Sequence, residues 1–347
     1  MAPLQGLRVL DLTRLLPGAV ATQHLSDHGA DVIKIEQPGE GDYARTLSPA
    51  VFARTNAGKR SVAIDLKHPE GKRVLESLAA TADILVEGFR PGVMHRLGLD
   101  YETLRLANNS LIYVSLTGYG QIGPYADLAG HDINYIALGG LLNLNLPVIP
   151  GVQIGDLVGG SMQAVIGVLM ALQARQRSGV GRHVDVSMTA GVQALLAIPL
   201  AEYERTGREP QAGREMLSGR YACYNVYQAK DGRWLAVGAL ESKFWANLCK
   251  QLDCMELIPL QFDDARQPEL KARLAGIFAT RDADTWFNQL RQTDCCVTPV
   301  RTVAEVYVPS EDPRRPPEIG EHTAELLAKS AYSEAEIQRL KNIGAVA

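Results

Sequence analysis

The sequence predicts an α/β protein with a large domain built on a parallel sheet and a smaller α+β domain. In the first 207 residues, short apolar stretches that resemble strands alternate with amphipathic helices. This alternation is typical of βαβ units and a parallel sheet. Further along, "YNVYQAKDGRWLAVGAL" (224–240) has the pattern of a β-hairpin turning at Asp231-Gly232, and helical segments follow it.

The strands of the large domain are short runs rich in Val, Ile and Leu, expected at 7–13, 30–38, 61–67, 83–89 and 111–120. Helices between them are expected at 18–29 and 69–82, and the longest at 161–179. That last helix carries Arg175 and Arg177 in its final turn, where cations favour a helix end. Residues 182–207 are expected to form a strand followed by one long helix.

The smaller domain is expected to add helices at about 242–253, 268–279 and 283–292, a strand at 295–302 and a tail helix at 333–344. The domain limits follow from these elements. Residues 1–207 form the large domain, and 208–222, polar and aperiodic, form a linker. Residues 223–305 form the small domain, and 306–347 form a C-terminal segment.

Composition excludes several classes of protein. Of the 347 residues, 46% are hydrophobic and 21% charged, which is usual for a soluble globular protein. The net charge of −4 gives no basic excess for nucleic acid. No uninterrupted apolar run of transmembrane length or signal-peptide core is evident, so no membrane partner is expected. Five cysteines, none in the first 222 residues, favour a reducing compartment and a cytoplasmic location.

The loop after the first strand does not match a nucleotide-binding motif. It reads "TRLLPGAV", with Pro17 where a dinucleotide loop needs open backbone, and no G-x-G-x-x-G follows. The sequence contains no G-x-x-x-x-G-K-[ST] either. Neither an NAD-binding protein nor a P-loop protein is therefore favoured.

Three residues are candidates for acid/base chemistry: His131 in "AGHDINY", Asp156 in "QIGDLVGGSMQAV" and Glu241 in "LAVGALESKFW". Each also has a structural explanation. His131 could be a core histidine whose tautomer Asp132 fixes, or Asp132 could cap a helix. Asp156 could cap the long helix, and Glu241 could favour the first turn of another. Spacing in the sequence does not show that the three meet.

Several motifs, spread in order over nearly the whole chain, identify a family. They are "LDLTRLLPG", "HGADVIKIEQPGEGD", "ILVEGFRPGVMHRLGLDYETL", "SLTGYGQIGPYADLAGHDINYIALGG", "GDLVGGSMQA", "GRHVDVSMTAG", "DGRWLAVGALESKFW", "CVTPV" and "GEHT". Together they resemble the class III CoA-transferase superfamily (CaiB/BaiF type), most closely its α-methylacyl-CoA racemases. The resemblance implies a large Rossmann-like domain and a small domain in an interlocked homodimer. The C-terminal segment would return to the large domain, which binds acyl-CoA. The active site would lie between the large domain of one chain and the small domain of the other.

The resemblance also implies a mechanism. His131 and Asp156 would act on opposite faces of the α-carbon of a 2-methylacyl-CoA, with Glu241 assisting the histidine, and would interconvert its R and S forms. A histidine and a partly desolvated carboxyl can exchange the roles of acid and base. Amide N–H groups near Asp156 are expected to stabilise the enolate oxygen. No metal or other cofactor is expected.

Two alternatives stay open. Transferases of the superfamily use the same aspartate as a nucleophile, so Asp156 could form a covalent CoA thioester and move CoA between carboxylic acids. The place of His131 is often a tyrosine in transferases, which favours proton transfer here. A non-catalytic CoA-binding paralogue is the third interpretation, disfavoured because all three acid/base residues are present.

For the phosphates of CoA, the resemblance indicates cations in the matching loops. They are Lys59 and Arg60 in "NAGKRS" and Arg90 in "EGFRPG", with Arg96 and Lys34 as weaker candidates.

The chain also departs from the racemase pattern in three places. Gln37 stands directly before Pro38, where the family often has a basic residue. Two segments, 132–155 and 306–319, look short for racemases, and we expect this to reshape the acyl pocket.

Overall fold

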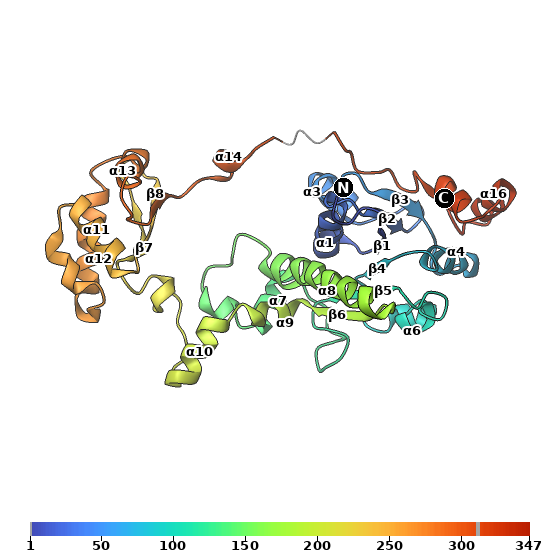
Figure 1. Cartoon of the computed structure of the whole chain (residues 1–347), viewed down its shortest axis with the longest axis horizontal. Coiled ribbons are helices and arrows are strands. Elements are labelled where there is room, and N and C mark those ends of the chain that lie inside the picture. The colour runs from blue at the N-terminus through green and yellow to red at the C-terminus, as the bar shows by residue number, and fades with distance from the viewer. Residues whose placement is uncertain (1, 310–312) are drawn as a thin grey trace. The chain divides into compact units, whose positions relative to one another are not determined.

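The computed structural model describes residues 2–309 and 313–347, which fold into two compact units (Figure 1). The first unit contains residues 2–142, 148–197 and 313–347. The second contains residues 143–147 and 198–309. The expected short segment 306–319 therefore lies partly outside the described residues.

The first unit is built on a sheet of six parallel strands in the order β3-β2-β1-β4-β5-β6. Their bounds are β1 (Arg8–Leu12), β2 (Asp31–Glu36), β3 (Arg60–Ala63), β4 (Ile84–Glu87), β5 (Ile112–Thr117) and β6 (His183–Ser187). This is the strand order of the dinucleotide-binding doubly wound fold, which reverses direction between β1 and β4. The predicted parallel sheet is confirmed.

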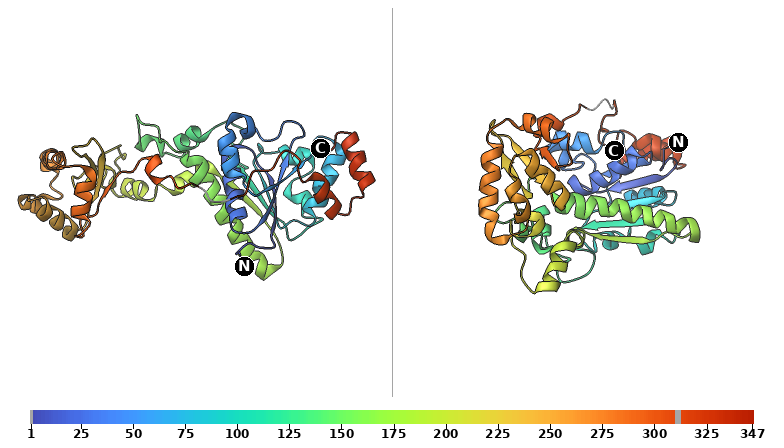
Figure 2. Two further views of the ribbon diagram at one scale, coloured as in Figure 1. Left: turned by 90° about the horizontal axis from the view of Figure 1, so that it is seen from above. Right: turned by 60° about the vertical axis from the view of Figure 1, so that its left-hand side comes forward.

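Helices cover both faces of this sheet. One face packs against α1 (Leu15–Asp27) and α8 (Gln163–Ser178), whose Ala164, Val168 and Ala171 are buried. The other packs against α4 (Pro69–Ala79), α15 (Thr323–Lys329) and α16 (Glu334–Asn342) (Figure 2). The C-terminal segment thus completes the core of this unit. Because both faces are covered, the central strands are almost wholly buried.

Short helices connect these layers. They are α2 (Ala44–Leu47), α3 (Pro49–Thr55), α5 (Val93–Leu97), α6 (Tyr101–Leu104), α7 (Asp132–Leu138), α9 (Met188–Ala194), the 3₁₀ turn η1 (Leu142–Leu144) and the π-helical η2 (Gly155–Met162). The expectation of one long helix up to residue 207 is wrong. α9 ends at Ala194, and a separate α10 (Ala197–Thr206) buries none of its residues. The unit boundary accordingly falls at residue 197, before the expected linker.

The second unit has an antiparallel sheet in the order β7 (Tyr224–Gln228), β8 (Trp234–Gly238) and β9 (Val297–Pro299), which confirms the predicted hairpin. It packs against α11 (Ser242–Gln251), α12 (Gln267–Phe278) and α13 (Ala283–Leu290). The core includes Trp245, whose indole N–H donates to the Leu257 carbonyl. Short elements complete the unit: η3 (Met216–Ser218), η4 (Met255–Leu260), η5 (Asp264–Arg266) and α14 (Val303–Val306).

One helical stretch of the described residues, Gly155–Ser178, is long and apolar enough to cross a membrane by length and composition alone. No run of that kind was expected. The signal is weak, because core helices meet the same test and α8 packs on the sheet through its buried alanines and Val168.

Candidate active site

A cavity of about 640 Å³ opens in the first unit where the central strands end. Its lining includes Thr13 and Arg14 just after β1, Phe89 and Arg90 after β4, and Tyr119 after β5. In open α/β sheets, ligands bind at the carboxyl ends of the strands where the strand order reverses. The volume is also within the usual range for small-molecule sites. Strand order alone therefore places a ligand site here.

His131 and Asp156 both line this cavity, so the structure brings these two predicted residues together. His131 is the N-cap of α7 and is exposed, and its backbone N–H donates to Asn134 Oδ1 at 3.0 Å. Asp156 lies in the first turn of η2 and is half-buried. The two side chains therefore reach the same space from different helix ends.

The carboxyl group of Asp156 has a raised affinity for protons. Burial raises the pKa of Asp156, the nearby charge of Asp132 raises it further, and His131 lowers it, with a result of about 6. A carboxyl with this pKa exists in both protonation states close to neutral pH. Such a group can remove a proton or deliver one.

Asp132 joins the two helix ends. Its Oδ1 accepts a hydrogen bond from the backbone N–H of Asp156 at 2.9 Å. The next amide, of Leu157, donates to the Gln153 carbonyl at 2.9 Å. These two amides are therefore already bonded, so the amides expected to stabilise the enolate oxygen are not those of Asp156 and Leu157. The role of Asp132 is to fix the backbone of Asp156.

Glycines hold η2 close to its neighbours. A Cβ on Gly191 of α9 would lie 2.2 Å from the Gly159 carbonyl oxygen, and one on Gly159 would lie 2.5 Å from that of Met188. In addition, Ser161 Oγ donates to the Pro17 carbonyl at 2.6 Å and ties η2 to the loop after β1. The glycines of "GDLVGG" thus permit the close approach that positions Asp156.

Two tyrosines that the sequence reasoning missed support the histidine loop. The Tyr135 hydroxyl donates to the Gly130 carbonyl, directly before His131. Its ring packs edge-to-face on Tyr119, with the centroids 5.3 Å apart. A Cβ on Gly118 would lie 2.3 Å from the Tyr135 ring, so this glycine makes room for it. The tyrosine that ends the motif "GHDINY" was the sequence signal that could have identified Tyr135 as part of the site.

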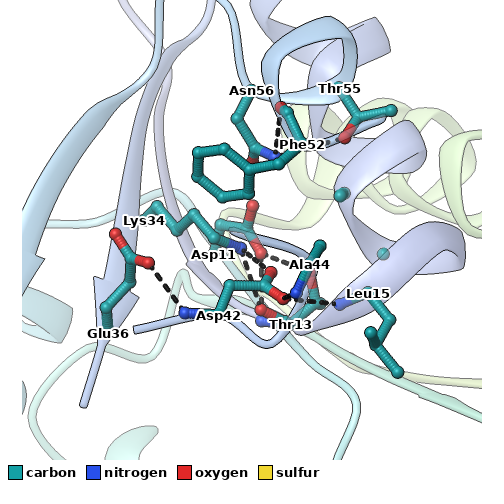
Figure 3. Close-up of polar contacts among 12 residues, drawn as sticks. Asp11, Thr13, Leu15, Lys34, Glu36, Asp42, Ala44, Phe52, Thr55 and Asn56 are labelled. Carbon is teal, nitrogen blue, oxygen red and sulfur yellow. Dashed lines mark hydrogen bonds and ion pairs between the residues drawn. The ribbon is translucent and has the colours of Figure 1, made fainter. Parts of the chain in front are cut away.

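Lys34, predicted as a CoA ligand, is buried inside the protein (Figure 3). Its ammonium lies 2.8 Å from Asp42 Oδ2 and donates to the Thr13 carbonyl at 3.0 Å. Burial lowers the pKa of Lys34, but the charges of Asp11 and Asp42 raise it overall. Because this ammonium is enclosed by its own chain, it does not fit the role of a phosphate ligand.

Lys59 belongs to the same buried network. Its ammonium donates to Thr22 Oγ1 at 2.7 Å, to Asn56 Oδ1 at 2.9 Å and to Asp11 Oδ2 at 3.2 Å. The side chain is fully buried. The prediction that Lys59 binds CoA phosphates is therefore corrected in the same way, since these donors are already bonded.

The arginine candidates differ in their contacts. The guanidinium of Arg60 pairs with the carboxylates of Asp31 and Glu325, so it is not a free cation. Arg90 lines the cavity and is exposed, and Arg96 is exposed on α5. Neither Arg90 nor Arg96 has an ion pair within residues 2–309 and 313–347. These two stay the candidates for CoA phosphates.

Among residues 2–309 and 313–347, no three His, Cys, Asp or Glu side chains are grouped as metal ligands.

Glu241, the third predicted acid/base residue, lies in the second unit. It is the exposed N-cap residue of α11, and its side chain makes no capping hydrogen bond there. The carboxylate is therefore not committed to the helix end, and the cavity of the first unit is lined without it.

Comparisons with known proteins agree with this fold and identify the family. The model of CoA-transferase family III matches residues 4–323. The human α-methylacyl-CoA racemase is 36% identical over 375 aligned residues, which cover 98% of this chain and 96% of the racemase. A succinate–glutarate CoA-transferase of Agrobacterium fabrum is 37% identical over 292 residues, covering 79% of this chain and 71% of the transferase. The crystal structure of a CaiB/BaiF family protein from Brucella suis superimposes with a TM-score of 0.80 at 30% identity, covering 95% of this chain and 99% of that one. The chain therefore belongs to CoA-transferase family III, the CaiB/BaiF family, and is an enzyme.

Proposed function

We propose that the enzyme is a 2-methylacyl-CoA racemase that interconverts R and S thioesters. The observation that carries this proposal is that His131 and Asp156 line one cavity, with a pKa for Asp156 of about 6. Racemisation by two bases needs one group deprotonated while the other is protonated. A histidine and a carboxyl with a pKa of about 6, facing the same cavity, can supply these two groups.

In the proposed reaction, one of the two groups removes the α-proton, and the electron pair of the C–H bond moves into the thioester as an enolate. The other group then donates a proton to the opposite face of the α-carbon. Each turnover leaves the base protonated and the acid deprotonated, so the pair is ready for the reverse direction. Asp132 holds the Asp156 backbone in place during both steps.

A CoA-transferase is the second candidate function. The succinate–glutarate CoA-transferase is about as similar to this chain as the racemase is. In this alternative the carboxylate of Asp156 attacks the thioester carbonyl and expels the CoA thiolate, which leaves a mixed anhydride. The thiolate then attacks the aspartyl carbonyl, so that the acyl group leaves as a carboxylate and CoA stays on Asp156 as a thioester. The exposed imidazole of His131 in the same cavity favours the racemase, because acyl transfer through an aspartyl thioester does not need a second proton-transfer group.

The test is isotope exchange. A single-epimer 2-methylacyl-CoA is incubated with the enzyme in deuterated water without an acceptor acid. We expect α-deuterium incorporation with loss of stereochemical purity. If label stays out across a broad acyl panel, the racemase proposal fails. A hydroxylamine-trapped thioester at Asp156 with acceptor-dependent CoA exchange would then support the transferase. Binding of CoA without either activity would support the non-catalytic paralogue.

We also propose that two chains form a homodimer, interlocked as in the family. Apolar side chains on neighbouring helices of the first unit are exposed: Ile133, Leu138, Val158, Ile166, Leu169 and Met170. Monomeric proteins rarely expose large contiguous apolar patches, so a second copy would cover them. Light scattering should give a mass twice that of the chain, and a monomer at working concentration would contradict this proposal.

In this dimer, we propose that Glu241 of each chain serves the cavity of the partner chain. Co-expressed His131→Ala and Glu241→Gln chains then form one intact site per mixed dimer and regain activity, whereas sites made within one chain stay impaired.

We also propose a reducing, cytoplasmic setting, because all five cysteines are free and four of them are buried.

A further inference from the structure

Arg14 is a cation of the cavity that the reaction proposed above does not use. It directly follows the buried Thr13, and its guanidinium lies over the rings of Tyr43 and Phe89, at 4.9 and 5.7 Å from their centroids. One of its N–H groups donates to the Tyr43 hydroxyl at 2.7 Å. Residues Arg14, Tyr43 and Phe89 all line the cavity. The guanidinium is thus stacked in place at the wall of the site.

The residues on either side of Arg14, Thr13 and Leu15, are bonded to the buried network of Figure 3. The carbonyl of Thr13 accepts from the Lys34 ammonium, and the N–H of Leu15 donates to Asp42 Oδ1 at 3.0 Å. Leu15 has a φ of 61°, a left-handed conformation that is costly for a residue with a Cβ and persists only where the surroundings fix it. Buried charges therefore hold this strained loop and aim Arg14 at the cavity.

The guanidinium of Arg14 has no acidic partner among the residues that the structure describes. A matched case shows what a structural arginine looks like in this unit. Arg45 also stacks on a ring, that of Phe52 at 4.1 Å, but it makes two hydrogen bonds to the carboxylate of Glu36. Arg14 has the stacking and lacks the carboxylate, so its remaining N–H donors are available to a ligand.

The catalytic carboxylate does not fill this role. Asp156 is the one acidic side chain among the described residues that line the cavity. Arg14 and Asp156 form no ion pair, and they come from different parts of the cavity wall, Arg14 from the loop after β1 and Asp156 from the start of η2. The cavity therefore contains a cation besides its proposed proton-transfer groups.

We propose that Arg14 is a substrate subsite for an oxyanion, namely a carboxylate at the far end of the acyl chain. The inference rests on the racemase function proposed above and specifies its substrate class: 2-methylacyl-CoA esters of dicarboxylic acids. A planar guanidinium binds a carboxylate through two parallel N–H bonds, so it would fix the distal end of the chain while the α-carbon lies between His131 and Asp156.

The CoA phosphates are the other source of an oxyanion on such a substrate. The structure favours the acyl carboxylate because Arg14 is half-buried and stacked on two rings, whereas Arg90 and Arg96 are exposed and accessible to hydrated phosphates. The experiment needs arms that separate the two sources.

The experiment measures kcat/KM for α-deuterium exchange with pairs of 2-methylacyl-CoA esters of equal length. One member of each pair ends in a carboxylate and the other in an amide. The wild-type enzyme should prefer the carboxylate. Arg14→Met should reduce kcat/KM for the carboxylate series by roughly 10- to 100-fold, the usual weight of a charged hydrogen bond, and change the amide series little. Arg14→Lys, which keeps the charge and loses the fork, should be intermediate.

Arg177→Met is the matched control. It removes an exposed arginine at the end of α8 that lies outside the cavity lining. The net charge changes by the same amount as in Arg14→Met, but the preference for the carboxylate ester over the amide should be unchanged. Thermal unfolding of each variant checks that the fold is retained. The same acyl pairs on dephospho-CoA and on pantetheine form the phosphate arm.

The results separate this inference from the proposed function. Equal losses in both acyl series, or a loss that disappears when the CoA phosphates are removed, would overturn the carboxylate subsite while leaving a racemase. If no thioester exchanges label, the racemase function fails. Calorimetric binding of the same pairs then still tests Arg14, because a carboxylate subsite predicts tighter binding of the carboxylate ester to wild type and not to Arg14→Met.

Discussion

The Asp132 carboxylate holds the backbone amide of Asp156 at 2.9 Å, so the residue after the proposed catalytic histidine positions the proposed catalytic aspartate. One hydrogen bond thereby joins the start of α7 to the start of η2. The same carboxylate also acts through its charge, since it raises the pKa of Asp156. Geometry and proton affinity at the site are therefore linked through one side chain.

Asp132→Asn should separate these two effects. The amide oxygen can still accept from the Asp156 N–H, but the negative charge that raises the Asp156 pKa is gone. Asp156 must be deprotonated to act as a base, so activity falls as pH drops through its pKa of about 6. In the variant this acidic limb of the kcat/KM profile should move to lower pH. Asp127→Asn, an exposed charge on the preceding loop, is the control and should leave the limb in place.

His131→Ala should reduce α-proton exchange by about 10²- to 10⁴-fold, the usual contribution of a general acid or base. Binding of CoA esters, measured by calorimetry, should change little because the imidazole is exposed at the cavity wall. His28→Ala removes an exposed histidine at the end of α1 and should retain full activity. Unchanged exchange in His131→Ala would remove the histidine from the mechanism.

The buried ion pairs around Asp11 should dominate the acid stability of the first unit. Burial raises the pKa of Asp11, but the charges of Lys34 and Lys59 and two threonine hydroxyls lower it overall, from 3.8 to about 2. The stabilisation from this carboxylate is present above pH 3.8 and is lost as pH falls through 2.

Asp11→Asn leaves two buried ammonium groups with one fewer counter-charge, so the free energy of unfolding should fall by about 3–5 kcal/mol. Chemical denaturation at neutral pH measures this. Glu325→Gln, which breaks exposed surface pairs with Lys329 and Arg60, should cost less than about 1 kcal/mol. Similar costs for the two variants would show that the buried network is not stabilising.

Gly191→Ala should disturb the support of Asp156. The added Cβ would lie 2.2 Å from the Gly159 carbonyl oxygen and 2.6 Å from the Gly159 Cα, both backbone atoms, so η2 must shift. We expect a destabilisation of about 1–3 kcal/mol and a reduced kcat. Gly276→Ala in α12, where a Cβ meets nothing within 4 Å, should instead stabilise the helix by up to about 1 kcal/mol. Full activity in Gly191→Ala would contradict this account.

The layout of the sheet could be predicted because the strands are buried on both faces and are therefore apolar throughout, which a sequence shows directly. The pairing of His131 with Asp156 needed the family motifs, since the two lie 25 positions apart. Burial of Lys34 and Lys59 could not be predicted. The partner of Lys59, Asp11, lies 48 positions away, and nothing in "NAGKRS" shows that the lysine points inward.

Two other features escaped for local reasons. The break between α9 and α10 falls at two leucines, so the apolar pattern continued across it. The signal was Pro199 in the first turn of α10, because proline is tolerated in a first turn and disrupts a helix interior. Arg14 was not among the candidate residues, because the aromatic rings that its guanidinium contacts belong to Tyr43 and Phe89, far along the chain.

The histidine of the site stands at the tip of a seven-residue helix outside the sheet, whereas the cavity itself follows from strand order. Evolution could therefore exchange the residue at position 131 without redesigning the scaffold. Because no strand register depends on position 131, the proposed difference between proton transfer and acyl transfer rests on the wall of the cavity and not on the sheet that forms it.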